Sequence, residues 1–239
     1  MSKLRLLNPE EVEEYGLQIE SYHPNGQIVY DFALSNFAVI AGPTGAGKDT
    51  LRNGLLQDTA FVKILSTTSR PPRPGEEEGV QYHFRPLDFF DEGIEDRRFL
   101  QIALVHKQQL SCLDFRDLME LSMGQIGLAI LVVQTEIGLR KLNPDLKTIF
   151  LVPPSLSELL TRMKKDRLVA DDELAHRVEA VSSEIQVALK QPSYYCIVND
   201  QIERAKNLAS QFLKSSQIDK DEDARAREVM KQILLELGQ

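Results

Sequence analysis

Asn36–Leu56 reads NFAVIAGPTGAGKDTLRNGLL, and the fold of the whole chain can be worked out from this stretch. Phe37–Ala41 is a short, continuously apolar run, which is typical of a parallel strand that is buried on both faces. The glycine-rich segment Gly42–Lys48 follows, and leucines at helical spacing come after it. The stretch therefore predicts a strand, a loop and a helix in direct succession.

The segment Gly42–Lys48 has the Gly-x-x-x-x-Gly-Lys spacing of a phosphate-binding loop. Glycines let the backbone wrap closely around an anion with its N–H groups turned inward, and the N-terminus of the next helix adds a favourable dipole. Lys48 supplies a positive charge for the outer phosphates. A flexible glycine-rich connection is the alternative, and the strand and helix on either side argue against it. The predicted phosphate-binding residues are Gly42, Thr44, Gly45, Ala46, Gly47, Lys48, Asp49 and Thr50.

Asp49 departs from the usual loop pattern, because Ser or Thr normally follows the lysine. A carboxylate at this position gains from the helix dipole, but it also faces the negative charges of bound phosphates. A Mg²⁺ ion between them would reverse the sign of that interaction, since Mg²⁺ takes both carboxylate and phosphate oxygens as ligands. We therefore predict that Asp49 and Thr50 help to hold Mg²⁺. The alternative is that Asp49 turns outward and only caps the helix.

The composition of the chain limits the classes of function. Its 239 residues, 42% of them hydrophobic, suffice for one large α/β domain with small inserts. The formal net charge of −8 gives no general attraction for nucleic acid. The N-terminus lacks the apolar region of a signal peptide, and no apolar run approaches membrane-spanning length. We therefore expect a cytoplasmic protein that binds neither nucleic acid nor membrane.

Apolar runs alternate with helical patterns after the loop, which predicts an α/β fold with a parallel sheet wrapped by helices. The clearest further strands are Ile126–Val133 and Tyr194–Val198. In the N-terminal extension, 1–35, the pair Asn25-Gly26 predicts a hairpin turn. The C-terminal extension, 214–239, has apolar residues at helical spacing, and packing back on the domain is a commoner outcome than binding a partner.

A second polar loop, Ser66–Phe84, reads STTSRPPRPGEEEGVQYHF. Arg70 and Arg73 lie three residues apart in it, with hydroxyl groups beside them and prolines that stiffen the backbone. Each guanidinium offers a planar fork of donors, which suits a phosphate group. On composition alone, a second phosphate site and a solvated surface loop explain this segment equally well.

Four motifs in this order make the chain resemble the guanylate kinase family over about 36–213. They are GPTGAGK, STTSRPPRPGEEEGVQYHF, IFLVPPSLSELLTRM and IVNDQIERA. The resemblance implies a P-loop NTPase core, a small nucleotide-binding insert over about 66–121 and a lid over about 164–172. It also implies transfer of the γ-phosphoryl group of ATP, with Mg²⁺, to a nucleoside monophosphate such as GMP.

The same resemblance assigns roles to individual residues. The acceptor's phosphate would be held by Ser66, Arg70, Arg73, Glu76 and Tyr82. The candidate catalytic residues, which would approach the phosphates of ATP, are Lys48, Arg162 and Arg177. Both phosphate sites are thus complete in the sequence, and small-molecule nucleotides are the expected binding partners.

The residues that would read the acceptor's base differ from the family pattern. Gln101 stands where the family has the Glu of Phe-x-Glu-Trp, and Cys112 where it has the last residue of Tyr-Tyr-Gly-Ser/Thr. Val132 and Gln134 replace the two aspartates that end a strand of the sheet. Because an amide accepts the N–H groups of guanine less strongly than a carboxylate, GMP is expected to be a poor acceptor.

Two other functions fit these motifs. One is a kinase of the same architecture with another phosphorylated acceptor, such as ribose 1,5-bisphosphate, because the Gly-Lys-Asp run is similar to the phosphate loop of that kinase. The other is a catalytically weak guanylate-kinase-like module that holds a protein partner at the former acceptor site, although the intact Lys48 weighs against it. The two terminal extensions would offer surfaces for self-association.

Overall fold

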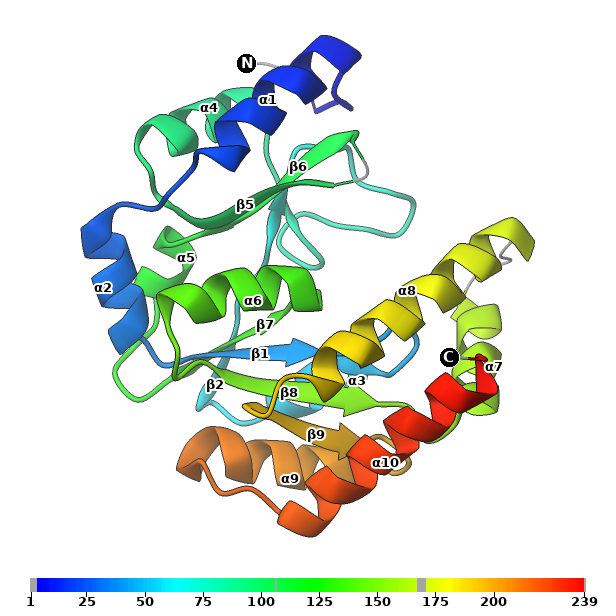
Figure 1. The fold of residues 1–239 in the computed structure, drawn as a ribbon. Coiled ribbons are helices and arrows are strands. Elements are labelled where there is room, and N and C mark those ends of the chain that lie inside the picture. Colours follow the sequence, from blue (N-terminus) through cyan, green and yellow to red (C-terminus); the bar gives the residue numbers. More distant parts are fainter. Residues whose placement is uncertain (1–3, 106, 167–170, 239) are drawn as a thin grey trace. The chain divides into compact units, whose positions relative to one another are not determined.

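The computed structural model describes residues 4–105, 107–166 and 171–238 of the chain (Figure 1). The chain forms two compact units. The first unit contains 1–37, 63–129 and 138–145, and the second contains 38–62, 130–137 and 146–239. Among the described residues, no helix is both long and apolar enough to cross a membrane.

A five-stranded sheet has the strand order β2-β7-β1-β8-β9. Its strands are β1 (Phe37–Ala41), β2 (Phe61–Lys63), β7 (Ile126–Ile130), β8 (Lys147–Val152) and β9 (Tyr194–Val198). β1 pairs in parallel with β8, and β8 pairs in parallel with β9. Every residue of β1 and β9 is buried, as expected of strands that are covered on both faces. The predicted parallel sheet is therefore confirmed.

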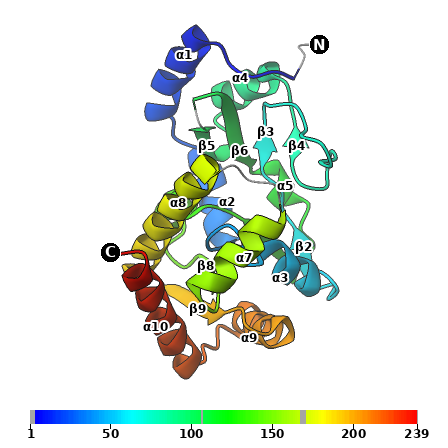
Figure 2. The same ribbon diagram turned by 90° about the vertical axis from the view of Figure 1, so that its right-hand side faces the viewer.

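Helices accompany this sheet in the alternation of strand and helix that the sequence predicts. They are α3 (Lys48–Leu55), α6 (Val133–Leu142), α7 (Leu156–Asp166), α8 (Asp171–Leu189), α9 (Ile202–Ser215) and α10 (Lys220–Glu236). Because α3 follows the glycine-rich loop directly, the strand, loop and helix predicted for 37–56 are all present. Helix α10 contacts both β9 and α8, and Figure 2 shows it running beside β9.

Helix α10 covers the outer edge of the five-stranded sheet. Its buried residues are Glu222, Ala226, Met230 and Ile233. The Glu222 carboxylate accepts a hydrogen bond from the backbone N–H of Val198 at 2.7 Å. The Asp223 carboxylate accepts one from the N–H of Cys196 at 2.9 Å. The C-terminal extension therefore packs back on the domain, as predicted, and its first turn satisfies backbone donors of the edge strand β9.

The first unit contains a smaller, mixed sheet with the strand order β4-β3-β6-β5. Its strands are β3 (Thr67–Thr68), β4 (His83–Phe84), β5 (Phe99–Val105) and β6 (Gln109–Asp114). β3 pairs in parallel with β4 and antiparallel with β6, which also pairs antiparallel with β5. Helices α4 (Leu87–Glu95) and α5 (Arg116–Met119) complete this part of the unit.

The N-terminal extension forms two helices, α1 (Pro9–Glu20) and α2 (Gly26–Leu34), so the expected hairpin turn is wrong. Asn25 is the N-cap of α2, and its side chain accepts a hydrogen bond from the N–H of Gln27 at 2.9 Å. Asn favours hairpin turns and helix N-caps alike, and here the cap is formed. Leu7 and Tyr15 enter the core of the small sheet with Phe90 and other apolar residues.

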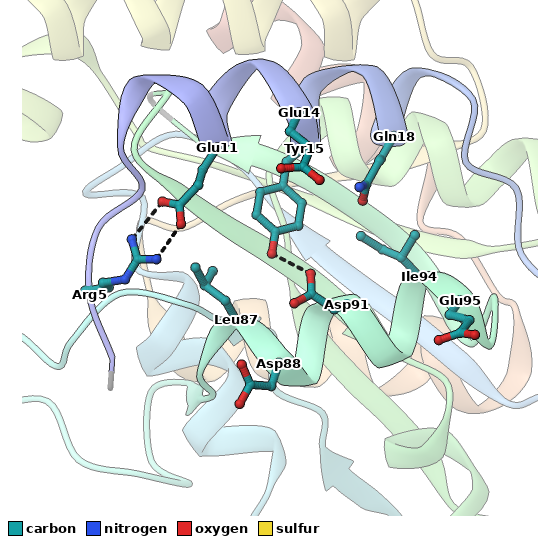
Figure 3. Close-up of a pocket in the computed structure, with 10 residues that line it drawn as sticks. All are labelled: Arg5, Glu11, Glu14, Tyr15, Gln18, Leu87, Asp88, Asp91, Ile94 and Glu95. Carbon is teal, nitrogen blue, oxygen red and sulfur yellow. Dashed lines mark hydrogen bonds and ion pairs between the residues drawn. The ribbon is translucent and has the colours of Figure 1, made fainter. Parts of the chain in front are cut away.

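A groove of about 560 Å³ lies between α1 and α4 (Figure 3). The hydroxyl group of Tyr15 donates to Asp91 at 2.6 Å across it, and Arg5 pairs with Glu11 at its rim. The carboxylates that line the groove are Glu11, Glu14, Asp88, Asp91 and Glu95. Such a surface repels phosphate, and none of the predicted phosphate-binding residues lines it. The hydrogen bond across the groove connects α1 with α4, and the acidic lining does not suit a nucleotide.

Candidate functional site

The loop between β1 and α3 has the backbone geometry of a phosphate-binding loop. Gly42, Gly45 and Gly47 have φ values of 137°, 84° and 94°, which residues with a Cβ rarely adopt. A Cβ at Gly42 would lie 2.4 Å from the backbone oxygen of Leu151. A Cβ at Gly47 would lie 2.4 Å from Nδ2 of Asn199. Both space and conformation therefore require glycine at these positions.

Lys48 begins α3, and its ammonium group folds back on the loop. Nζ donates hydrogen bonds to the backbone oxygens of Gly42 at 2.5 Å and Pro43 at 3.0 Å. Burial lowers the pKa of Lys48, while the carboxylates of Glu184 and Asp49 act in the opposite direction. A phosphate would offer Nζ a charged acceptor in place of two neutral carbonyl groups, and such hydrogen bonds are the stronger kind.

A cavity of about 520 Å³ lies over this loop, a size that is ordinary for a ligand site. Its lining residues are Thr44, Gly45, Gly47, Lys48, Asp49, Thr50 and Arg162. The sequence predicts every one of them for the phosphates of the donor. The remaining loop residues of that prediction, Gly42 and Ala46, are buried beneath the loop surface.

Arg162 lies on α7 and is held at the cavity by two contacts. Nε pairs with Glu158, one helical turn earlier, at 2.9 Å, and Nη2 donates to the backbone oxygen of Asn199 at 3.3 Å. Arg177, the other predicted arginine, lies on α8, but its side chain is outside the described residues. Residues 167–170 of the predicted lid are outside them as well.

Asn199 was not predicted as a site residue, although it belongs to the IVNDQIERA motif. Its Nδ2 donates to the backbone oxygen of Ala46 at 2.8 Å, and its backbone N–H donates to Val152 at 2.8 Å. Its backbone oxygen receives the contact from Arg162. Asn199 thus ties the phosphate loop to the end of β8 and to α7, and only the motif signals this role in the sequence.

Asp49 lies in the first turn of α3 with 77% of its side chain exposed. Its Oδ1 pairs with Nη2 of the buried Arg52 at 2.9 Å. The N-cap of α3 is Gly47, which forms no side-chain cap, so this geometry does not support the capping alternative for Asp49. Among the described residues, no three His, Cys, Asp or Glu side chains are grouped so that they could hold a metal ion. A cation here would have to take most of its ligands from phosphates and water.

In the first unit, Arg70 is only 6% exposed although it lies in the polar loop. Its guanidinium forms a two-pronged pair with Glu76, in which Nη2 and Oε1 are 2.9 Å apart. The centroids of the Tyr82 and Phe84 rings lie 5.2 Å and 5.6 Å from its Cζ. The hydrogen bond from Arg70, helped by one from the N–H of Arg73, holds the pKa of Glu76 below its usual value. Arg70 is therefore a charged, fixed fork of donors.

The other predicted residues of this loop lie around Arg70 in different ways. The backbone N–H of Arg73 donates to Glu76 at 2.8 Å, and the Arg73 side chain is exposed. The backbone oxygen of Ser66 accepts a hydrogen bond from the N–H of His83 at 3.0 Å, which joins β3 to β4. The structure thus brings Arg70, Glu76 and Tyr82 into contact, and it leaves Arg73 at the surface of the same loop.

The strand register shows on which face of the small sheet Ser111 and Cys112 lie. Cys112 pairs with Thr67 and is buried in the core of the first unit. Ser111 pairs with Thr68, which in turn pairs with Phe84, beside Arg70. Because side chains alternate along a strand, Ser111 lies on the face of Phe84 and Arg70. Cys112 therefore lies on the face of the small sheet that is opposite Phe84 and Arg70.

The family model described as guanylate kinase matches residues 35–216 of the chain. The guanylate kinase of Onion yellows phytoplasma (strain OY-M) is 35% identical over 172 residues, which cover 70% of this chain and 79% of that protein. The guanylate kinase of Caldanaerobacter subterraneus subsp. tengcongensis is 30% identical over 188 residues, with coverages of 77% and 90%. The crystal structure of guanylate kinase from Anaplasma phagocytophilum has the same fold, with a TM-score of 0.58 at 24% identity, and covers 82% of this chain and 93% of that one.

Proposed function

Because the chain belongs to the guanylate kinase family, we propose that it transfers the γ-phosphoryl group of ATP to GMP. The observation that carries this proposal is that one chain contains both a glycine-rich loop with Lys48 under a cavity and a second, fixed cationic group, Arg70. The second unit has the loop with Lys48 and a cavity over it. The first unit has Arg70, fixed by Glu76 and flanked by Tyr82.

The chemistry requires no nucleophile from the protein. A phosphate oxygen of GMP forms a bond to the γ-phosphorus in line with the leaving group, and the bond from that phosphorus to the β–γ bridging oxygen breaks, which yields GDP and ADP. The protein aligns the two substrates and neutralises charge. Lys48, Arg162 and Arg177 serve the donor phosphates, and Arg70 and Arg73 serve the acceptor phosphate.

Arg70 is suited to this task before the acceptor arrives. Its hydrogen bonds to Glu76 and to the backbone oxygen of Pro71 use three of the five N–H donors of a guanidinium. The bidentate pair with Glu76 fixes the plane of the fork, so that little ordering remains to be done when a phosphate binds. The insert over about 66–121 would thus hold the acceptor, and the lid over about 164–172 would approach the donor.

Mg²⁺ is part of the same proposal, and the donor set fits it. Asp49 and Thr50 offer a carboxylate and a hydroxyl group beside the cavity, and Nη2 of Arg52 donates to Oδ1 of Asp49. Mg²⁺ commonly takes one or two carboxylates together with phosphate oxygens and water. When bound, it would neutralise charge on the phosphates of ATP.

Asp49→Asn tests this assignment of the metal. We expect the variant to need more Mg²⁺ for half-maximal turnover at fixed ATP, because an amide is a weaker ligand than a carboxylate. Asp49→Ser, which restores the ordinary loop sequence, should need less Mg²⁺ than Asp49→Asn. An unchanged Mg²⁺ dependence in Asp49→Asn would remove Asp49 from the metal site.

The direct experiment follows the products of ATP and Mg²⁺ with GMP, other nucleoside monophosphates and ribose 1,5-bisphosphate by ³¹P NMR. We expect GDP and ADP. Arg73→Ala should raise the KM for GMP about ten- to a hundredfold with little change in the KM for ATP, since it removes a charge-assisted hydrogen bond. The matched control is Arg5→Ala, which removes an exposed guanidinium of the same unit outside the site.

Other outcomes of this experiment assign other functions. Turnover of ribose 1,5-bisphosphate without turnover of GMP would identify a kinase with a different acceptor. If the chain showed no saturable, Mg²⁺-dependent affinity for ATP, it would be a binding module.

Cytoplasmic location and self-association complete the proposal. ATP and GMP are both cytoplasmic metabolites. Self-association is supported by large apolar side chains of the N-terminal extension that are exposed, with exposed fractions of 71% for Leu17, 62% for Tyr30 and 70% for Leu34. Sedimentation of the full chain and of the Leu17→Ser/Tyr30→Ser/Leu34→Ser variant tests this. A monomer at every concentration would contradict it.

A further inference from the structure

Glu78 occupies a position in the polar loop to which the sequence assigns no role. Its Oε2 accepts a hydrogen bond from the backbone N–H of Phe84 at 2.7 Å. Its Oε1 accepts one from Nη1 of Arg85 at 2.8 Å and lies 3.1 Å from Nδ1 of His83. Burial acts to raise the pKa of Glu78, but the hydrogen bonds from Phe84, His83 and Arg85 outweigh it and the pKa is lowered. The carboxylate is therefore ionised at neutral pH. It connects the loop to His83 and Phe84, which form β4, and to Arg85, which follows β4.

The backbone around Glu78 forms a compact turn. Glu78 and Tyr82 make an isolated bridge, and the N–H of Gly79 donates to the backbone oxygen of Tyr82 at 3.0 Å. Gly79 has a φ of 74°, which allows the chain to reverse there. The turn ends at Tyr82, directly before β4, and Phe84 is the second residue of that strand. Fixing Glu78 to the N–H of Phe84 therefore fixes both ends of this turn.

The two aromatic residues at the end of the turn are the rings that flank Arg70. Tyr82 and Phe84 pack edge to face with their centroids 6.1 Å apart. Both centroids lie within 6 Å of the Arg70 guanidinium, the range in which a cation is attracted to a ring face. Arg70 is thus supported by Glu76 and by the rings whose position depends on the turn.

We propose that Glu78 is a positioning residue for the acceptor phosphate, which it serves by holding Tyr82 and Phe84 against the guanidinium of Arg70. The inference rests on the proposed function only in taking Arg70 as the phosphate ligand. Glu78 itself touches no substrate. Without its hydrogen bonds the turn populates other conformations, and the apparent affinity for the acceptor falls in proportion to the fraction of molecules that remain competent.

This mechanism predicts which kinetic constant changes. At saturating acceptor the bound phosphate itself holds Arg70 and Tyr82, so kcat stays close to its original value. At low acceptor concentration the unoccupied turn must first be ordered, so the KM for the acceptor rises. Glu76 still supports Arg70, and the Glu78 side chain is 49% exposed, so we expect a moderate increase of about three- to tenfold.

The test compares Glu78→Ala, Glu78→Gln and Glu77→Ala in the full chain. Glu78→Ala should raise the KM for GMP with kcat within about twofold and the KM for ATP unchanged. Glu78→Gln keeps an oxygen that can accept from the N–H of Phe84, so it should recover most of the loss. Glu77→Ala removes the same charge from the neighbouring exposed residue and should not raise the KM for GMP.

Hydrogen exchange of the peptide amides over 79–86 gives a second measurement that needs no turnover. The Phe84 amide should exchange faster in Glu78→Ala than in the original chain and in Glu77→Ala. Faster exchange with an unchanged KM, or an equal loss of kcat and of kcat/KM, would overturn the positioning role. If the original chain phosphorylated no acceptor, the proposed function would fail, and unchanged exchange in Glu78→Ala would separately overturn the role of Glu78.

Discussion

Gln101 is half-buried on β5, and its pairing places it on the same face of the small sheet as Ser111. Across the strands, Gln101 faces Leu113, and Ala103 faces Ser111. Phe84 and Arg70 lie on this face too, so we expect the base of an acceptor held at Arg70 to lie on the side that carries Gln101 and Ser111. An amide and a hydroxyl group can both donate and accept, and they discriminate less sharply than a carboxylate.

Replacing this amide with a carboxylate should sharpen the choice of acceptor. We expect Gln101→Glu to raise kcat/KM for GMP by about tenfold or more, because a carboxylate accepts the N–H groups of guanine through charge-assisted hydrogen bonds. kcat/KM for AMP should stay the same or fall. The comparison variant is Gln108→Glu, which adds the same charge at an exposed position beside β6. Equal gains for both nucleotides would show that the added charge does not read the base.

Asp117, on α5, is an ionisable residue outside the proposed phosphate sites, and burial destabilises its ionised form. Its Oδ2 is buried and has no hydrogen-bond partner among the described residues. Burial raises the pKa of Asp117 to about 6, and the Asp114 and Glu120 carboxylates act in the same direction, against His83 and Arg116. A carboxyl group in the unfolded chain has a pKa of about 4. The folded state therefore holds the proton more tightly, so the ionised form costs stability above about pH 6.

Because the pKa of Asp117 is raised in the folded state, the effect of replacing it with Asn should depend on pH. Asp117→Asn should raise the free energy of unfolding by about 1–2 kcal/mol near neutral pH, after allowance for solvent screening. The gain should disappear as the pH falls from about 6 to about 4, where the original carboxyl group becomes protonated in the folded state. Urea unfolding across that range measures it. An equal gain at both ends would mean that packing, and not ionisation, is responsible.

For single residues, the sequence predicts some positions and leaves others open. It could not decide whether Arg70 lies in a phosphate site or in a solvated loop, because the answer depends on the closing of the loop onto Glu76. It predicted the strand, the glycine-rich loop and the helix around Lys48 correctly, since the spacing of these residues alone carries the geometry. It did not say which face of the small sheet Cys112 occupies, because one residue of register moves a side chain across a sheet.

Secondary-structure elements were predictable where their own residues determine them. β1 and β9 are apolar along their whole length, and such runs have few alternatives. β3 and β4 have two residues each and exist only through their pairing with distant strands. For α2 the local signal is ambiguous, because Asn25-Gly26 suits both a hairpin turn and the N-cap of a helix.

The C-terminal helix α10 lies outside the residues matched by the family model, yet the sheet depends on it. Removing residues 217–239 would leave the N–H groups of Cys196 and Val198 at the edge of β9 without their carboxylate acceptors. It would also uncover the apolar surface beneath Met230 and Ile233. We expect the truncated chain to unfold at a clearly lower temperature and to aggregate, as measured by calorimetry and light scattering.

A double variant tests whether α10 also needs the charges of its two carboxylates, which pair with Arg204, Arg225 and Arg227. Glu222→Gln/Asp223→Asn keeps the helix and its apolar face, and its amide oxygens can still accept from β9. It should lose much less stability than the truncation does. A truncated chain as stable as the original would show that β9 needs no cover.

For the whole molecule, the two proposed phosphate sites belong to different compact units, so each nucleotide should protect a different unit from amide exchange. A non-hydrolysable ATP analogue with Mg²⁺ should slow amide exchange over 42–55 and 147–163, in the second unit. GMP alone should slow exchange over 66–84, in the first. If GMP protected only the loop around Lys48, the acceptor site would be wrongly assigned. The sequence motifs predict both of the proposed phosphate sites. They do not predict contacts between segments far apart in the sequence, such as the hydrogen bond from Asn199 to Ala46.

The lowered pKa of Lys48 also has a consequence for covalent chemistry. A lysine with a lowered pKa presents more of its neutral amine, which is the nucleophilic form, than surface lysines do at the same pH. An ATP analogue that carries an acyl group on its terminal phosphate would therefore transfer that group to Nζ and leave an amide. We expect tryptic mass spectrometry to find Lys48 acylated before the exposed Lys231, and excess ATP to prevent the labelling. Labelling of both lysines at equal rates, unaffected by ATP, would mean that the loop does not guide the reagent to Lys48.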